Sequence, residues 1–145
     1  MSVDVVTEIE IARPRAEVAA FACDPDNATR WYENIDSVVW RTPRPLAVGT
    51  ELEFVARFLG RTLAYTYEVR EHQPGERFVM RTAHGPFPME TTYAFEDAGP
   101  GTRMRLRNRG EPAGFARVAA PLMERAMRRA NRADLRRLKG LLEAS

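Results

Sequence analysis

Seven stretches of this chain alternate between apolar and polar residues, and one long amphipathic helix follows the last of them. A period of two residues is typical of strands that bury one face, so the alternation predicts a sheet with a single inner face. Most residues of that face are large and apolar, but they include a belt of hydroxyl, amide and imidazole groups. A solid core disfavours such groups, because a buried polar group without a partner costs free energy. We therefore expect a curled sheet and a helix that enclose a cavity for a mostly apolar small molecule.

The predicted order of elements is a strand, two short helices, six strands and the long helix, an α+β arrangement with an antiparallel sheet. Pro or Gly residues mark the four connections between the last five strands, as tight turns require. No repeat or linker divides the chain, so we expect one domain over residues 1–145. The predicted strands cover residues 3–11, 35–41, 50–59, 62–71, 77–84, 87–96 and 102–109, and the predicted helices cover about 17–21, 24–32 and 115–143.

The short turns allow the pairing of neighbouring strands to be predicted. Phe58 is expected opposite Leu63, and Tyr65 opposite Thr82. Continuing the ladder keeps all inward residues on one parity, as a sheet with one inner face requires. The other parity holds charged residues and is the expected solvated face.

Arginines alternate along the last predicted strand, which could indicate a strand that binds nucleic acid. The predicted pairing, however, places Glu96 across from Arg103 and Glu90 across from Arg109. Cross-strand ion pairs explain the pattern, and no aromatic residues lie between these arginines to stack on bases. No specific nucleic acid is therefore expected as a partner of the sheet.

The long helix has one basic side and one apolar side at helical spacing. The apolar side holds Phe115, Ala119, Leu122, Met123, Ala126, Met127, Ala130, Leu138 and Leu141, and Arg137 falls on it as an exception. The basic side holds Arg125, Arg128, Arg129, Arg132, Arg136 and Lys139. A solvated face is the favoured interpretation, and docking to an anionic surface such as lipid headgroups or RNA is the alternative.

Composition limits the classes of protein further. The 145 residues carry a net charge of +2, which does not by itself indicate a nucleic-acid partner. The single cysteine, Cys23, excludes an internal disulfide, and no run of about 18 apolar residues could span a membrane. The start of the sequence has no apolar segment of a signal peptide, so we expect a cytoplasmic protein. Its oligomeric state stays open, with a homodimer as one alternative.

The inner belt supplies the candidate ligand-binding residues. Asn108, which the pairing places opposite Thr91, is the most suggestive, because an amide in an apolar interior needs partners for both ends. The candidates are Trp31 of the second short helix, Phe54, Phe58, Tyr65, Tyr67, Met80, Thr82, His84, Phe87, Met89, Thr91, Tyr93 and Asn108 of the strands, and Phe115, Leu122 and Ala126 of the long helix.

Catalytic machinery is poorly represented in the sequence. No nucleophile elbow, no His and Cys cluster for a metal, and no glycine-rich phosphate loop is present, so neither metal nor cofactor is expected. Cys23 fits a core residue better than a nucleophile. If protons are transferred, His84 and Tyr65 are the candidate carriers.

Four stretches give the chain a resemblance to a known superfamily: IARPRAEV at residues 11–18, DP at 24–25 leading to Trp31, YTYEV at 65–69, and GEPAGF at 110–115. They resemble the START-like, helix-grip superfamily, and within it the polyketide cyclase/dehydrase and lipid-transport (SRPBCC) branch. The resemblance implies a deep cavity between sheet and long helix, entered near the start of that helix. The implied mouth is formed by Trp31, Phe58, Leu59, Arg61, His84, Phe87, Pro88 and Phe115.

The same resemblance implies ligands such as lipids, sterols, polyketides, hormones or quinones, and in some members cyclisation of poly-keto chains without a cofactor. Three functions follow as expectations. The first is binding of a hydrophobic small molecule, the second is a cofactor-free cyclase or dehydratase, and the third is docking of RNA, a ribosome or a membrane on the basic helix face. The sequence does not identify the ligand.

Overall fold

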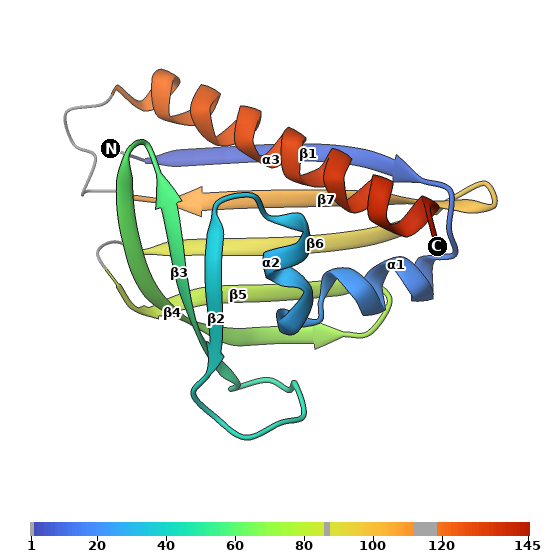
Figure 1. Cartoon of the computed structure of the whole chain (residues 1–145), viewed down its shortest axis with the longest axis horizontal. Helices are drawn as coiled ribbons and strands as arrows, with labels where there is room; N and C mark the ends of the chain where they lie inside the picture. Colours follow the sequence, from blue (N-terminus) through green and yellow to red (C-terminus); the bar gives the residue numbers. More distant parts are fainter. Residues whose placement is uncertain (1, 86–87, 112–118) are drawn as a thin grey trace.

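A computed structural model describes residues 2–85, 88–111 and 119–145 of the chain, and Figure 1 shows how its elements are arranged. The strands form one antiparallel sheet in the order β1-β7-β6-β5-β4-β3-β2. Its elements are β1 (Val3–Ile11), α1 (Arg15–Ala22), the 3-10 turn η1 (Pro25–Asn27), α2 (Ala28–Trp31), β2 (Ile35–Trp40), β3 (Glu51–Phe58), β4 (Arg61–Gln73), β5 (Arg77–His84), β6 (Met89–Ala98), β7 (Gly101–Gly110) and α3 (Ala120–Glu143).

The sheet curls so that β2 and β3 stand steeply across the direction of β6 and β7, and α3 crosses the concave side (Figure 1). α3 packs against β1 and touches α2, while α1 contacts β6 and β7. The predicted α+β architecture, with strand, short helices, six strands and a long helix, is therefore confirmed. None of the helices in the described part of the chain combines the length and apolar character needed to cross a bilayer.

The hairpin between β3 and β4 is tighter than predicted. Phe58 pairs with Arg61 and not with Leu63, because the loop consists of Leu59 and Gly60 alone. Both loop residues have positive φ, 49° and 75°, as a two-residue hairpin of the I′ type requires. This turn is hard to predict from the sequence, because leucine rarely adopts positive φ. Since the error is two residues, the predicted inner face stays the inner face.

A bulge near the end of β5 overturns the prediction for His84. Thr82 pairs with Tyr67, whereas His84 pairs with Thr66, so Ala83 is an extra residue without a partner in β4. An extra residue reverses the face of everything beyond it. His84 is consequently exposed, and the prediction that it faces the cavity is wrong.

The predicted ion pairs on the outer face are confirmed. Glu96 Oε1 lies 3.1 Å from Arg103 Nη1, and Glu90 Oε1 lies 2.8 Å from Arg109 Nη2. Glu90 also pairs with Arg81 at 2.7 Å. The pair of Glu96 and Arg103 is exposed, and a pair of this kind contributes about 0–1 kcal/mol. The Glu90 side chain is 13% exposed and is shared by two arginines.

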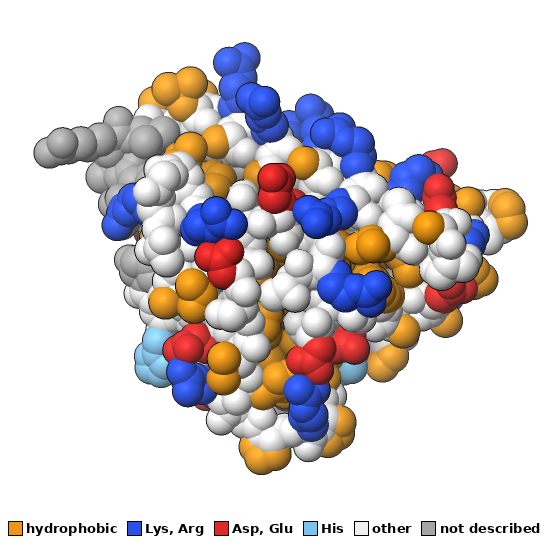
Figure 2. Space-filling view, viewed as in Figure 1, with side chains coloured by type: hydrophobic (Ala, Val, Ile, Leu, Met, Phe, Trp, Pro, Cys, Tyr) orange, Lys and Arg blue, Asp and Glu red, His pale blue; other side chains and the backbone are white. Residues whose placement is uncertain are grey.

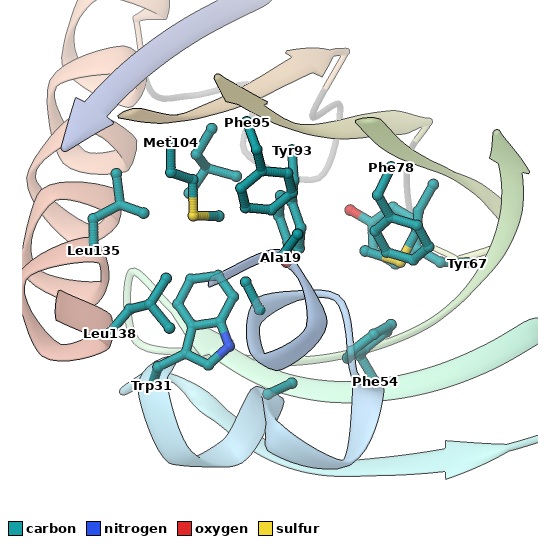
Figure 3. Packing of buried hydrophobic residues seen from close by; sticks show 14 of the residues in the cluster. Ala19, Trp31, Phe54, Tyr67, Phe78, Tyr93, Phe95, Met104, Leu135 and Leu138 are labelled. Atoms are coloured by element: carbon teal, nitrogen blue, oxygen red, sulfur yellow. The ribbon is translucent and has the colours of Figure 1, made fainter. Parts of the chain in front are cut away.

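Aromatic and aliphatic side chains fill the end of the concavity near α1 and α2 (Figure 3). Trp31 lies among Leu135 and Leu138 of α3 and Tyr93 of β6, and it is fully buried. Its ring centroid is 5.7 Å from that of Tyr93. The expected place of Trp31 at the cavity mouth is therefore wrong, because α2 turns the indole into the core.

The inner face of α3 is rotated relative to the predicted apolar stripe. Leu122 is 58% exposed and Arg137 is exposed, whereas Asn131 and Asp134 are 7% and 4% exposed. The face that packs on the sheet consists of residues 123, 127, 131, 134 and 138. These positions are three or four residues apart, as expected for one narrow face of a helix. Residues 115–118 of the predicted helix lie outside the described residues.

Two glycines, Gly101 at the start of β7 and Gly140 in α3, differ in the space around them. A Cβ on Gly101 would lie 2.5 Å from the carbonyl oxygen of Ile11, whereas a Cβ on Gly140 of α3 meets nothing within 4 Å. We expect Gly101→Ala to lower the free energy of unfolding by about 1–3 kcal/mol through overpacking. Gly140→Ala should raise it by about 0.5–1 kcal/mol, because alanine restricts the unfolded chain and favours helix. Urea unfolding of both variants measures the difference, and changes of the same sign would contradict this account.

Candidate functional site

A cavity lies between the concave face of the sheet and α3. Its volume of about 160 Å³ compares with roughly 10–15 Å³ for one water molecule, so it has room for a much larger ligand. The described residues that line it come from the segment after α2, from strands β2 to β7 and from α3. They are Tyr32, Asn34, Ile35, Phe54, Ala56, Arg57, Phe58, Leu63, Tyr65, Tyr67, Met80, Thr82, Met89, Thr91, Tyr93, Asn108, Met123, Met127, Ala130, Asn131 and Asp134.

Most of the predicted ligand-binding residues on the strands do line this cavity: Phe54, Phe58, Tyr65, Tyr67, Met80, Thr82, Met89, Thr91, Tyr93 and Asn108. Trp31, His84, Leu122 and Ala126 do not line it. Phe87 and Phe115 lie outside the described residues. Whether any of these residues contacts a ligand stays a prediction.

The aromatic wall of the cavity is held by edge-to-face contacts. The ring of Tyr67 lies 5.6 Å from Phe54 and 5.4 Å from Tyr65, at interplanar angles of 79° and 88°. Such contacts fix the rings and add a little to the free energy of burial. Gly85 lies close against Tyr65, since a Cβ on it would be 2.6 Å from Cβ of Tyr65.

A short hydrogen-bonded chain crosses β4, β6 and β7 on the cavity wall. Thr91 Oγ1 donates to Asn108 Oδ1 at 2.8 Å and lies 3.4 Å from the hydroxyl of Tyr67. The predicted pairing of Thr91 with Asn108 is confirmed. The Asn108 Nδ2 group has no hydrogen-bond partner among the described residues, so both of its N–H donors are available to a ligand.

Tyr32 and Tyr93 form a second polar pair, with their hydroxyl oxygens 2.7 Å apart. One O–H donates to the other oxygen, so the accepting hydroxyl keeps its own hydrogen for a further partner. Burial is the main cause that raises the pKa of both tyrosines, and burial likewise raises the pKa of Tyr65. All three therefore stay protonated at neutral pH and act as neutral hydrogen-bonding groups.

Two polar lining residues that the sequence did not predict, Asn131 and Asp134, lie on α3. Asp134 Oδ1 accepts a hydrogen bond from the backbone N–H of Glu33 at 3.1 Å, and the carboxyl group has no ion pair within the described part of the chain. Burial raises the pKa of Asp134 to about 6. The Asn131 Nδ2 group, one turn earlier, is buried without a hydrogen-bond partner.

Neither of the other chemically reactive side chains belongs to this site. His84 lies outside the cavity, and burial raises the pKa of the Cys23 thiol to about 12, so that the reactive thiolate is scarce. Among residues 2–85, 88–111 and 119–145, no group of His, Cys, Asp and Glu could hold a metal ion.

The basic face of α3 differs from the outer face of the sheet. Figure 2 shows Lys and Arg side chains gathered along the top of the molecule, over α3. Five arginines of this face form no ion pair with the described residues: Arg125, Arg128, Arg129, Arg132 and Arg136. The arginines of β7, by contrast, are paired with acidic residues. Lys139 pairs with Glu143 at 2.8 Å, but the charge of the five arginines on α3 is not neutralised within the described part of the chain.

The raised pKa of Asp134 predicts a stability that depends on pH. An unfolded aspartate titrates near 3.8, so the folded state binds this proton more tightly. The destabilising effect of the carboxylate is absent below pH 4, grows as the pH rises from about 4 to about 6, and is complete above that. Asp134→Asn should therefore stabilise the protein by about 1–3 kcal/mol at pH 7.5 and by little at pH 4.

Thermal unfolding at the two pH values measures this effect. Glu111→Gln, which changes an exposed carboxylate, serves as the control and should leave the pH profile unchanged. A gain for Asp134→Asn of equal size at pH 4 and pH 7.5 would show that packing, and not ionisation, is responsible.

The sequence matches one known family along almost its whole length. Residues 2–143 match the family described as polyketide cyclase/dehydrase and lipid transport. No curated protein sequence matches significantly.

Solved structures with this fold come from several sources. TTHA0849 from Thermus thermophilus has a TM-score of 0.81 at 23% identity, over 98% of this chain and 99% of that one. A START superfamily protein from Mycobacterium smegmatis has a TM-score of 0.82 at 14% identity, over 97% of each chain. The Zhui aromatase/cyclase from Streptomyces sp. R1128 has a TM-score of 0.79 at 15% identity, over 99% of this chain and 94% of that one.

At these identities the structures show the fold alone, and that fold is the predicted START-like, helix-grip fold. The match to the family, by contrast, spans nearly all of the sequence. The chain belongs to the polyketide cyclase/dehydrase and lipid transport family.

Proposed function

We propose that this chain is a single ligand-binding domain that holds a small, mostly apolar molecule in the cavity between the sheet and α3. The observation that carries the proposal is the cavity itself, about 160 Å³ in volume, with walls of aromatic and methionine side chains and a few polar groups. Mostly apolar walls with few convergent polar groups are typical of small-molecule sites.

Hydrogen-bonding groups without partners in the cavity favour a site that binds a ligand over an interior that is only packed with side chains. Asn108 Nδ2 and Asn131 Nδ2 lack partners among the described residues, and one hydroxyl of the Tyr32–Tyr93 pair retains a free hydrogen. Of these groups, Asn131 Nδ2 is fully buried, and an unpaired buried polar group costs about 1–3 kcal/mol. A ligand with a few oxygen atoms would remove part of that cost, whereas an empty or purely packed interior would not.

The ligand class also agrees with the descriptions of the relatives. The family description names polyketide cyclisation and lipid transport, and one structure with this fold is an aromatase/cyclase. Polyketides and lipids combine an apolar body with a small number of oxygens, which is the pattern that the cavity walls would accommodate.

Dye binding tests the proposal. The neutral dye N-phenylnaphthylamine should gain fluorescence on binding to the wild-type protein. Ala130 of α3 lines the cavity, so Ala130→Trp fills the space that the dye needs. We expect this substitution to weaken binding at least about tenfold, which corresponds to about 1.4 kcal/mol.

Ala47→Trp provides the matched control, since Ala47 is exposed and is not one of the lining residues. It should leave the dye affinity unchanged. If the wild-type protein does not bind the dye, or if both variants lose binding equally, the cavity is not the binding site.

One observation favours a second function, a cofactor-free cyclase or dehydratase. Of the predicted proton carriers, His84 lies outside the cavity, and the raised pKa of Tyr65 keeps this side chain protonated. Asp134 lines the cavity with a pKa of about 6, which suits a general base at neutral pH. In a cyclase its carboxylate removes a proton from the carbon beside a carbonyl group, the enolate carbon forms a bond to a second carbonyl carbon of the same molecule, and the resulting alkoxide takes up the proton. With a simple ketone only the first step can occur, and the enolate is reprotonated at carbon.

Exchange of the methyl hydrogens of acetophenone for deuterium in heavy water measures that step without knowledge of the natural substrate. Asp134→Asn should slow protein-catalysed exchange by about 100-fold or more, because a general base has been removed. Arg132→Gln, on the exposed side of α3, should retain the wild-type rate. Exchange no faster than in buffer would rule out this second function for simple ketones.

A further inference from the structure

The side chain of Asn131 is the least satisfied polar group of the cavity. The residue is 7% exposed, it lines the cavity, and its Nδ2 atom is fully buried without a hydrogen-bond partner. It makes no side-chain hydrogen bond to any described residue. An amide buried in this way is expected to meet a hydrogen-bonding group that the described residues do not supply.

Asp134 lies one turn further along α3 and lines the same cavity. Side chains three residues apart share one face of a helix, with their Cβ atoms about 5–6 Å apart. Only Oδ1 of Asp134 has a partner among the described residues, the backbone N–H of Glu33, although the residue is 4% exposed. The second carboxyl oxygen is therefore an unused acceptor beside the unused donor of Asn131.

The charges around this pair are few. Burial is the largest cause of the raised pKa of the Asp134 carboxyl; the hydrogen bond from the backbone N–H of Glu33 lowers this pKa, the charge of Glu33 raises it, and the charge of Arg137 lowers it. The hydroxyl groups of Tyr32 and Tyr93 are neutral. The remaining charged residue that lines the cavity, Arg57, is exposed and hydrogen-bonds with Asp36 at 3.1 Å. No cation in the described part of the cavity is thus placed to hold an anionic ligand beside Asp134.

We propose that Asn131 and Asp134 form a subsite for a neutral hydroxy-carbonyl compound, such as a phenolic ketone or the enol of a dicarbonyl compound. The Asn131 Nδ2 group donates to the carbonyl oxygen of the ligand, and the Asp134 carboxylate accepts from its hydroxyl group. This inference rests on the proposed binding function and specifies the ligand class. The apolar body of the ligand then packs on the methionine and aromatic walls.

The same pair selects against carboxylates. A ligand carboxylate in this subsite would face the ionised Asp134, whereas Arg137, the cation that acts on this carboxyl group, is exposed and does not line the cavity. Like charges repel strongly in a site shielded from water. A hydroxyl group in the same place gains a hydrogen bond to a charged acceptor, which is stronger than one between neutral groups. Neutral ligands with a donor beside an acceptor are therefore preferred.

Displacement of N-phenylnaphthylamine by three matched compounds tests the subsite at pH 7.5. meta-Hydroxyacetophenone offers the donor and the acceptor, acetophenone offers only the acceptor, and meta-hydroxybenzoate replaces the ketone by an anion. For the wild-type protein we expect the hydroxyketone to bind about tenfold or more tightly than acetophenone, as a hydrogen bond to a charged group implies. The benzoate should bind at least about tenfold more weakly than the hydroxyketone.

Variants assign the preference to its residues. In Asp134→Asn, the bond from Glu33 N–H holds the amide oxygen, so the amide NH₂ turns toward the ligand hydroxyl. The preference for the hydroxyketone should then fall to about threefold or less, and the benzoate should gain affinity. Asn131→Leu should weaken both ketones by a similar factor and keep the hydroxyl preference. Arg132→Gln, exposed on the other side of α3, should leave the ranking unchanged.

The outcomes separate the two proposals. If the dye does not bind, the binding function and this subsite both fail. If the dye binds and the three compounds displace it with no hydroxyl preference, or with a preference that Asp134→Asn leaves intact, the binding function stands and the subsite is overturned. A benzoate that binds the wild-type protein as tightly as the hydroxyketone would likewise overturn the subsite.

Discussion

The two-residue period of side chains along a strand is the constraint on which the rest of this structure depends. Each hairpin from β3 to β7 sets which face of the next strand points inward, so one wrong step would turn the cavity wall toward solvent. The loop of Leu59 and Gly60 changes the pairing of β3 with β4 by two residues relative to prediction, and the inner face survives. The bulge at Ala83 changes it by one, and His84 leaves the cavity.

This difference explains how far the sequence could predict the fold and the site. Alternation identifies the inner residues of a regular strand, and Tyr67, Thr91 and Asn108 line the cavity as predicted. The alternation of apolar and polar residues does not reveal where a bulge inserts an extra residue. A prediction from alternation alone therefore assigns His84 to the wrong face of the sheet. Trp31 is misplaced for a related reason, since the direction of a four-residue helix depends on what it packs against.

Polar residues on α3 are missed by the sequence prediction because hydrophobicity is the criterion for its inner face. Leu122 meets that criterion and is exposed, while Asn131 and Asp134 are buried. The spacing of Met123, Met127, Asn131, Asp134 and Leu138 contains the correct face, once a polar residue is allowed inside. A site of function is where such a conflict between local pattern and burial is expected, since a group that costs stability is retained for another reason.

The cavity therefore combines different contributions from two parts of the fold. The sheet supplies rings and a hydrogen-bonded chain from Tyr67 through Thr91 to Asn108, whereas α3 supplies an amide and a carboxyl group that the described residues leave largely unpaired. Leu135 and Leu138, close to those two groups in sequence, pack against Trp31 in the core and hold this part of α3 in place (Figure 3). A polar pair anchored by a packed core is held in a fixed geometry before any ligand arrives, and such preorganisation favours selection of the ligand by its hydrogen-bonding groups.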